Sequence, residues 1–241
     1  MSQTDRFTGR ADAYVTGRPT YPAVAIDTLL AGLGDPAALI VADLGAGTGI
    51  SARAVAERGP RVVALEPNAA MRAKAEPHPR ITWVNGTAEA TTLEPSSVHV
   101  AAAFQAWHWF DHDAAMRELQ RVVRHGGRVA LLGYERDEND PFTRALGDIF
   151  RTHATEPIEQ LRADALARFT AIPGARRTEY RSIQKLDRPG LHARLSSSSY
   201  VPHAGEPERA MLADADALFD RYSREEVVHI RLVTYLVIAD V

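Results

Sequence analysis

The stretch LIVADLGAGTGISARAVAERGPRVVALEPN, Leu39 to Asn68, decides the fold. It begins as an apolar run that ends in an acid, Asp43, and then passes through three closely spaced glycines into a helical pattern. A second apolar run ends in another acid, Glu66. The order strand, glycine loop, helix and strand is typical of a site for a nucleotide-type cofactor, because it brings the loop to the carboxyl edge of a parallel sheet.

The bulk composition restricts the class of protein. The 241 residues suffice for one large α/β domain, and 45% hydrophobic and 24% charged residues are ordinary for a globular chain. A net charge of −3, with no run of lysine or arginine, argues against nucleic acid as the main partner. The absence of cysteine excludes disulfides, thiol nucleophiles and cysteine-ligated metals.

No targeting segment or metal motif stands out. The first 22 residues lack an apolar signal region, and no apolar run approaches membrane-spanning length, so we expect a cytoplasmic protein with no membrane partner. The histidines form no spacing typical of a metal site. The sequence leaves the oligomeric state open.

The first half of the chain alternates between strand and helix patterns. A helix is expected over 112–124, and RHGGRV at 124–129 reads as its end followed by a strand. This alternation predicts right-handed βαβ units and a parallel sheet covered on both faces. Strands are expected at 39–44, 61–66, 81–85, 98–104 and 128–134.

The second half has a different rhythm. Amphipathic helices are expected around 142–150, over 157–169 and around 211–222, with a strand at 178–187 and a last strand from about 229. A Pro/Gly/Ser-rich segment precedes the third helix, and Ser196 to Ser199 read as a flexible loop and not as a nucleophile. We expect one domain made of an arm or lid (1–30), a cofactor-binding core (31–135), a helical cap with a late strand (136–225) and the last strand (226–241).

The glycine spacing favours one class of cofactor. Gly45, Gly47 and Gly49 form G-x-G-x-G, whereas the dinucleotide fingerprint G-x-G-x-x-G would require a glycine where Ile50 stands. A ligand without a pyrophosphate does not need that third glycine. Asp43 lies where an acid can meet a cationic amine, and Glu66 lies where an acid can accept both ribose hydroxyls.

Several motifs together resemble class I S-adenosylmethionine-dependent methyltransferases, of the methyltransferase type 11-like kind. VADLGAGTG and VVALEPN are similar to the family's cofactor motif, and the likeness continues through VNGTAEATTL, VHVAAAFQAWHWFD and ELQRVVRHGGRVALL to the N-terminal FTGRADAYVTGRPTYP. The HWFD box looks closest to the small-molecule subgroup typified by trans-aconitate methyltransferases. The resemblance covers the first 135 residues well and the cap only loosely.

The resemblance implies a fold and an activity. The fold would be α/β and Rossmann-like, with a mostly parallel seven-stranded sheet, helices on both faces, an antiparallel last strand and a helical cap. The activity would be transfer of a methyl group from S-adenosyl-L-methionine to an oxygen, nitrogen or carbon atom of a small-molecule metabolite, leaving S-adenosyl-L-homocysteine. No metal takes part in this scheme.

The resemblance also implies a set of cofactor-binding residues. In the family, the glycine loop approaches the methionine portion, the acid after the second strand takes the ribose, and the following loops border the adenine. The fourth strand ends beneath the sulfonium, and an N-terminal segment folds over the cofactor. The corresponding residues are Tyr14, Arg18, Asp43, Gly45, Ala46, Gly47, Gly49, Glu66, Pro67, Asn68, Met71, Thr87, Ala88, Glu89, Phe104, Gln105 and Ala106. Many relatives carry an aspartate where this chain has Thr87 beside Ala88.

The acceptor side is expected at the aromatic box and the arm. The candidates are Tyr21, Trp107, His108 and Trp109, with His108 as the general base if the acceptor needs one. A plain packing role is the alternative for the tryptophans, and a structural role is the alternative for His108.

Two rival functions stay open at this point. One is an NAD-dependent oxidoreductase, which the displaced third glycine disfavours. The other is a protein that binds S-adenosylmethionine without transferring methyl groups, or that steers another reaction of a bound substrate. DNA amino-methylating enzymes carry an Asn/Asp-Pro-Pro-aromatic box where this chain has FQAWHW, so a small molecule is the expected substrate and nucleic acid is not.

Overall fold

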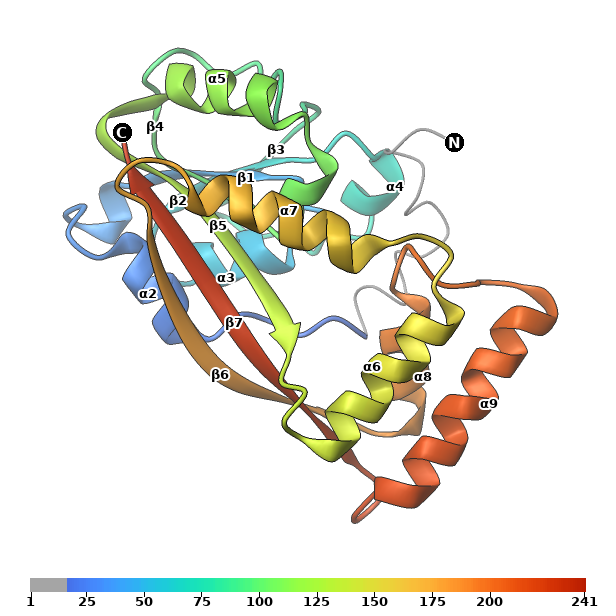
Figure 1. Ribbon diagram of the computed structural model, residues 1–241. Coiled ribbons are helices and arrows are strands. Elements are labelled where there is room, and N and C mark those ends of the chain that lie inside the picture. The colour runs from blue at the N-terminus through green and yellow to red at the C-terminus, as the bar shows by residue number, and fades with distance from the viewer. Residues whose placement is uncertain (1–16) are drawn as a thin grey trace.

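The computed structural model describes residues 17–241. One seven-stranded sheet runs through the molecule in the order β3-β2-β1-β4-β5-β7-β6 (Figure 1). All strands are parallel except β7, which runs antiparallel to both of its neighbours. The predicted Rossmann-like sheet with an antiparallel last strand is therefore confirmed. The strands are β1 (Ile40–Leu44), β2 (Arg61–Leu65), β3 (Ile81–Val84), β4 (Val98–Phe104), β5 (Val123–Arg136), β6 (Arg176–Leu186) and β7 (Val228–Asp240).

The helices fall into two groups. The longer ones are α2 (Ala23–Leu30), α5 (His112–Val122), α6 (Pro141–His153), α7 (Ile158–Thr170), α8 (Arg188–Ser196) and α9 (Gly205–Tyr222). The short ones are α3 (Ile50–Ala56), α4 (Ala69–Arg72) and the 3-10 turns η2 (Pro36–Ala38) and η3 (Trp107–Trp109). Asp111, Asp140 and Asp187 each cap a helix by accepting hydrogen bonds from backbone N–H groups of its first turn.

Two apolar layers cover the sheet. Buried residues of α2 and α3 pack on one face, and buried residues of α5 and α7 pack on the other (Figure 1). The central strands are apolar on both sides, as strands covered by two helical layers must be. In β1, for example, Val41, Ala42 and Leu44 are fully buried.

The helices α6, α8 and α9 gather at one end of the long strands β5, β6 and β7 (Figure 1). We call these three helices the cap. Their buried residues, such as Phe142, Leu191 and Met211, belong to the same apolar cluster as α2 and α3. Helix α7 lies outside the cap, since Phe169 packs edge-on against Trp107 of η3 on the opposite face.

Two local predictions were wrong. Helix α5 ends at Val122, before the glycine pair, because β5 already pairs with β4 at Val123 and then shifts register. Gly126 (φ 76°) lies in that irregular segment. Ser196 to Ser199, expected as a flexible loop, begin at the last residue of α8, and Ser197 and Ser198 are fully buried.

Within residues 17–241, no helix is long and apolar enough to cross a membrane. The same residues contain no group of three or more His, Cys, Asp or Glu side chains arranged to hold a metal ion.

Candidate cofactor and acceptor site

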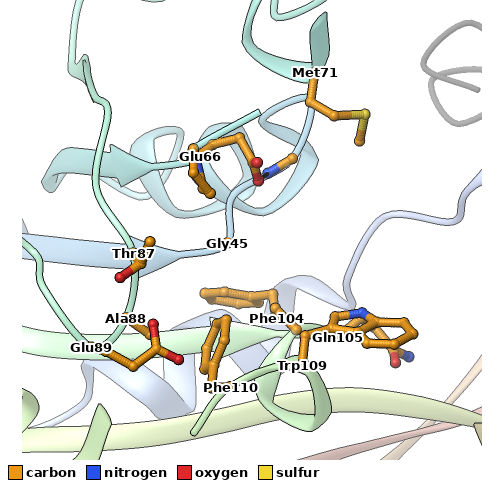
Figure 2. Close-up of a pocket in the computed structure, with 13 residues that line it drawn as sticks. Gly45, Glu66, Met71, Thr87, Ala88, Glu89, Phe104, Gln105, Trp109 and Phe110 are labelled. Atoms are coloured by element: carbon orange, nitrogen blue, oxygen red, sulfur yellow. Dashed lines mark hydrogen bonds between the residues drawn. The ribbon is translucent and has the colours of Figure 1, made fainter. Parts of the chain in front are cut away.

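A cavity of about 150 Å³ opens at the carboxyl ends of β1, β2 and β4 (Figure 2). On the two sides of β1 the chain crosses over in opposite directions, and ligands of open α/β sheets bind at such a switch point. The cavity is lined by Gly45, Gly47, Glu66, Pro67, Met71, Thr87, Ala88, Glu89, Phe104, Gln105, Ala106, Trp109 and Phe110. All of these except Phe110 are candidates from the sequence.

The glycine loop turns tightly between β1 and α3. Gly45 has φ 68°, and a Cβ placed there would lie 2.9 Å from the Cβ of Ala106. Gly49 has φ 86° and precedes α3, but its missing side chain makes room for Trp83 and not for the cavity. Thus Gly45 lines the cavity, whereas Gly49 lies on the side of the loop that packs against Trp83.

Glu66 ties the two halves of the cavity wall together. Its Oε2 accepts a hydrogen bond from the N–H of Gly47 (2.9 Å), and its Oε1 accepts one from the N–H of Asn68 (2.8 Å). Burial raises the pKa of Glu66 despite these two hydrogen bonds. Each carboxylate oxygen keeps a further lone pair, so the side chain has acceptors to offer to two hydroxyl groups of a ligand. Asn68 itself caps α4 and does not line the cavity.

Asp43 lies beneath the glycine loop. It is fully buried, and its Oδ2 accepts a hydrogen bond from the hydroxyl of Ser51 at 2.6 Å. Burial raises the pKa of Asp43 to about 7. The other oxygen, Oδ1, has no hydrogen-bond partner in the described part of the chain. Asp43 therefore supports the loop from within and does not line the cavity.

The β3–β4 loop forms one side of the cavity. Thr87 and Ala90 close a turn with hydrogen bonds between their backbones, and the Thr87 hydroxyl accepts a further one from the N–H of Ala90 (3.2 Å). Glu89 accepts a hydrogen bond from the N–H of Asp111 (2.9 Å), which joins this loop to the start of α5. Figure 2 shows Thr87, Ala88 and Glu89 together on this side.

Aromatic side chains form the floor opposite Glu66. Figure 2 shows the rings of Phe104 and Phe110 below Glu66, with Trp109 beside Gln105. Gln105 adopts φ 56°, an unusual backbone conformation for a residue other than glycine, and its side-chain amide donates to the carbonyl of Tyr134 (3.0 Å). Phe110 was missed because no periodicity in a short turn indicates which of several adjacent aromatic residues faces a cavity.

Two residues of the aromatic box lie outside the lining. Trp107 is 2% exposed; its ring stacks on that of His112 and packs edge-on against Phe169. His108 is half-buried, and its ring lies 4.5 Å from that of Trp109. Burial lowers the pKa of His108 well below 6.5, and nearby arginines add to this effect, so the imidazole is neutral at physiological pH.

The arm contributes from the side of the cap. Tyr14 lies outside the described residues. Arg18 donates to the carbonyl of Ser197 (2.9 Å) and to the hydroxyl of Tyr134 (3.4 Å), and Tyr21 packs edge-on against Phe104. Arg18 and Tyr21 line a smaller cavity of about 20 Å³, which Gly45, Ala46, Phe104 and Tyr134 also border.

Comparisons with known proteins agree with this architecture. Residues 42–131 match a family model described as a methyltransferase domain. An uncharacterised methyltransferase of Mycobacterium tuberculosis is 43% identical over 147 residues, which cover 59% of this chain and 58% of that protein. The chain therefore matches less than two thirds of the length of this relative. An uncharacterised methyltransferase of Schizosaccharomyces pombe is 25% identical over 221 residues, covering 88% of this chain and 86% of that protein.

Solved structures share the fold over most of the chain. A structure described as a putative type II methyltransferase from Anaeromyxobacter dehalogenans has a TM-score of 0.67 and 28% identity, covering 92% of this chain and 96% of its own. An S-adenosylmethionine-dependent methyltransferase from Geobacter sulfurreducens, solved with S-adenosyl-L-homocysteine, has a TM-score of 0.57 and 17% identity, covering 100% and 99%. The second likeness concerns the fold alone.

Proposed function

We propose that this chain, whose residues 42–131 match a methyltransferase domain and whose fold is that of class I S-adenosylmethionine-dependent methyltransferases, methylates a small molecule. The cofactor of this family is S-adenosyl-L-methionine, which supplies an electrophilic methyl group when bound. The acceptor would be an oxygen, nitrogen or carbon nucleophile, attacking in line with the breaking bond. The trans-aconitate subgroup remains a prediction.

One observation carries the proposal. The cavity at the switch point has a carboxylate, Glu66, held by backbone N–H groups on both of its oxygens, and it faces aromatic rings across the cavity. A ligand with a vicinal diol, an adenine ring and a cationic centre fits these three properties. Hydroxyls would donate to the carboxylate, the purine would lie among apolar side chains, and the aromatic faces would favour positive charge.

We assign the predicted cofactor residues to this ligand as follows. Gly45 and Gly47 would border the methionine portion, Glu66 the ribose and Met71 with Ala88 the adenine. Asp43, Gly49 and Asn68 would act indirectly, by holding the loops that border the cavity. Arg18 approaches from the cap side, where its guanidinium suits the cofactor carboxylate.

The acceptor would lie between the aromatic floor and the cap. Trp109, Phe110 and Gln105 border that end of the cavity (Figure 2). His108, beside Trp109, is the proposed base for a neutral nucleophile: its imidazole is unprotonated, but its lowered pKa makes it a weak base, so it would take the proton only as methyl transfer makes the nucleophile acidic. A carboxylate or phenolate acceptor would need no base. Proximity and the exclusion of water would supply most of the rate acceleration.

A methyl-transfer assay tests the proposal. The protein is incubated with radiolabelled S-adenosylmethionine and pools of small acids, phenols, amines and alcohols, and labelled products are separated. We expect label to enter at least one pool, and His108→Ala to lower turnover while sparing the affinity for S-adenosylhomocysteine. Tight binding of S-adenosylhomocysteine without labelling of any pool would favour a binding protein that does not transfer methyl groups.

A further inference from the structure

Three arginines and two tyrosines meet where the cap joins the core. Arg136 comes from β5, Arg162 from α7 and Arg194 from α8. Tyr134, two residues before Arg136, and Tyr200, just after α8, are both buried among them. We call Arg136, Arg162 and Arg194 the arginine cluster. None of them was a candidate from the sequence, because they are far apart in the chain.

Arg194 is the most deeply buried member, with 4% of its surface exposed. Its guanidinium lies 5.6 Å from the centre of the Phe150 ring and 5.9 Å from that of Tyr134. Its hydrogen bond to the hydroxyl of Ser198 is long, at 3.4 Å, and its Nε has no partner in the described part of the chain. A buried guanidinium with so few hydrogen bonds is unusual, since burial of an unpaired charge is costly.

Carboxylates neutralise only part of the positive charge of the arginine cluster. Arg136 pairs with Glu159 at 2.5 Å and lies over the Phe150 ring, while Arg162 lies 5.9 Å over the ring of Tyr200. Within residues 17–241, no carboxylate forms an ion pair with Arg162 or Arg194. The Nε atoms of Arg136 and Arg162 are also buried without a partner among these residues.

The pKa values of the residues in this region reflect an excess of positive charge. Burial raises the pKa of Tyr134 and of Tyr200, yet the surrounding arginines outweigh burial and hold both values below 10.0. Burial lowers the pKa of Arg194 to about 10, and Arg18 and Arg136 push it in the same direction. An anion placed here would be attracted by several charges at once.

The cluster adjoins the candidate site. The Tyr134 ring is 6.2 Å from that of Tyr21, which in turn packs on Phe104 of the cavity floor. The carbonyl of Tyr134 accepts the hydrogen bond from Gln105, another residue of the cavity lining. The positive charge of Arg162 also lowers the pKa of His108, which precedes Trp109 of the cavity lining. Tyr134 therefore links the arginine cluster to residues of the cavity lining.

We propose that Arg194 and Arg162 bind an oxyanion, a carboxylate or a phosphate, carried by the methyl acceptor at a distance from the methylated atom. That the bound molecule is the methyl acceptor rests on the proposed function. It makes the two arginines determinants of substrate specificity. The competing interpretation is that Arg194 only holds the cap against the core through its contacts with Phe150 and Tyr134.

Calorimetric titration tests this proposal. Protein saturated with S-adenosylhomocysteine is titrated with succinate, inorganic phosphate and, as the uncharged counterpart, succinamide. We expect succinate, phosphate or both to bind and succinamide not to bind, and whichever anion binds identifies the source of the oxyanion. Arg194→Met and Arg162→Gln should each weaken that binding by about tenfold or more.

Arg188→Met is the matched control, because Arg188 also lies on α8 and over an aromatic ring, Phe219, but pairs with Asp216. It should leave anion binding unchanged. Thermal unfolding separates the two roles of Arg194: in an anion-binding site, Arg194→Met keeps or raises the melting temperature of the anion-free protein, whereas a purely structural arginine would lower it.

Two results would overturn the proposal: neither anion binds, or both arginine variants bind as tightly as the parent. Titration with S-adenosylhomocysteine alone is a separate measurement. If S-adenosylhomocysteine does not bind, but the anions bind the protein without it, the proposed function is contradicted and the anion site stands.

Discussion

At the scale of single residues, Glu66 joins three parts of the candidate site. Its carboxylate holds the N–H of Gly47 in the glycine loop and the N–H of Asn68 at the start of α4. It also faces the cavity, where its remaining lone pairs are available to a ligand. A change at Glu66 should therefore affect ligand binding more than a change at an exposed acid.

We expect Glu66→Gln to weaken binding of S-adenosylhomocysteine by about 10- to 100-fold, because hydrogen bonds to a charged acceptor contribute about 1.5–3 kcal/mol. Calorimetric titration measures the change. Glu76→Gln, which alters an exposed acid paired with Arg53, is the control and should bind like the parent. Equal affinities of the two variants for S-adenosylhomocysteine would contradict the assignment of the ribose to Glu66.

Asp43 gives the free protein a specific pH dependence. Its pKa rises from 3.8 to about 7 on folding because it is buried. The unfolded chain therefore loses this proton first, and the contribution of Asp43 makes the fold less stable as the pH rises from 3.8 to about 7. The expected loss is on the order of 4 kcal/mol, at about 1.4 kcal/mol for each pKa unit.

Urea unfolding across this pH range checks the prediction. In Asp43→Asn, which retains an oxygen to accept the Ser51 hydrogen bond, that decline should be absent. Parallel pH profiles for the parent and the variant would mean that Asp43 is already ionised at low pH in the folded protein.

Residue types and spacing predicted all of the cavity lining except Phe110. Gly45, Glu66 and Ala88 follow strands whose ends must meet at one sheet edge, so their positions follow from topology. Phe110 was missed, and Trp107 lies in the core, because a short turn has no period that assigns its aromatic side chains to a side. Arg194 joins the site region through tertiary packing alone.

At the scale of elements, the glycine loop and the end of β4 fit together closely. Gly45 approaches Ala106 and Phe110, so the β1–α3 loop and η3 meet across the cavity. A side chain at position 45 would meet both, whereas at Gly126, which also has a positive φ, nothing lies within 4 Å of an added Cβ. Substitutions at these two glycines therefore distinguish two effects: both strain the backbone, but only a side chain at position 45 would also clash with neighbours.

Gly45→Ala should lower the free energy of unfolding by about 2–5 kcal/mol, through strain and overpacking, and weaken binding of S-adenosylhomocysteine. Gly126→Ala should cost only about 1–2 kcal/mol from the backbone and leave binding unchanged. Chemical denaturation and titration of both variants provide the comparison. Similar losses in the two would show that Ala106 and Phe110 move aside.

Elements with a strong periodic pattern were predicted, and elements with mixed signals were not. Strands β1, β2 and β4 are apolar on both faces, and α5, α6 and α9 have clear apolar faces. Helix α8 was not predicted because Pro189 and Gly190 stand near its start and the serines from Ser196 onward lie at and beyond its end, all of which are typical of loops. Its Asp187 cap, the proline in its first turn and the buried Leu191–Leu195 pair stabilise it as a helix.

At the scale of the whole molecule, the order of the strands determines where the cavity lies, and the cap packs beside it. The switch point beside β1 follows from strand order, and the family match over residues 42–131 covers this part of the chain. The cap helices come from the segment in which residue patterns and family resemblance were least informative. In the proposed function, acceptor specificity would depend on contacts such as those of Arg194, which only the folded chain assembles.

The most direct test of the central claim is calorimetric titration of the purified protein with S-adenosylhomocysteine, S-adenosylmethionine and NAD in parallel. We predict micromolar binding of the first two and none of NAD, because the cavity suits a ribose and a cation beside a loop without the third glycine of the dinucleotide fingerprint. Binding of NAD alone would contradict the assignment of the cavity and with it the proposed methyl transfer.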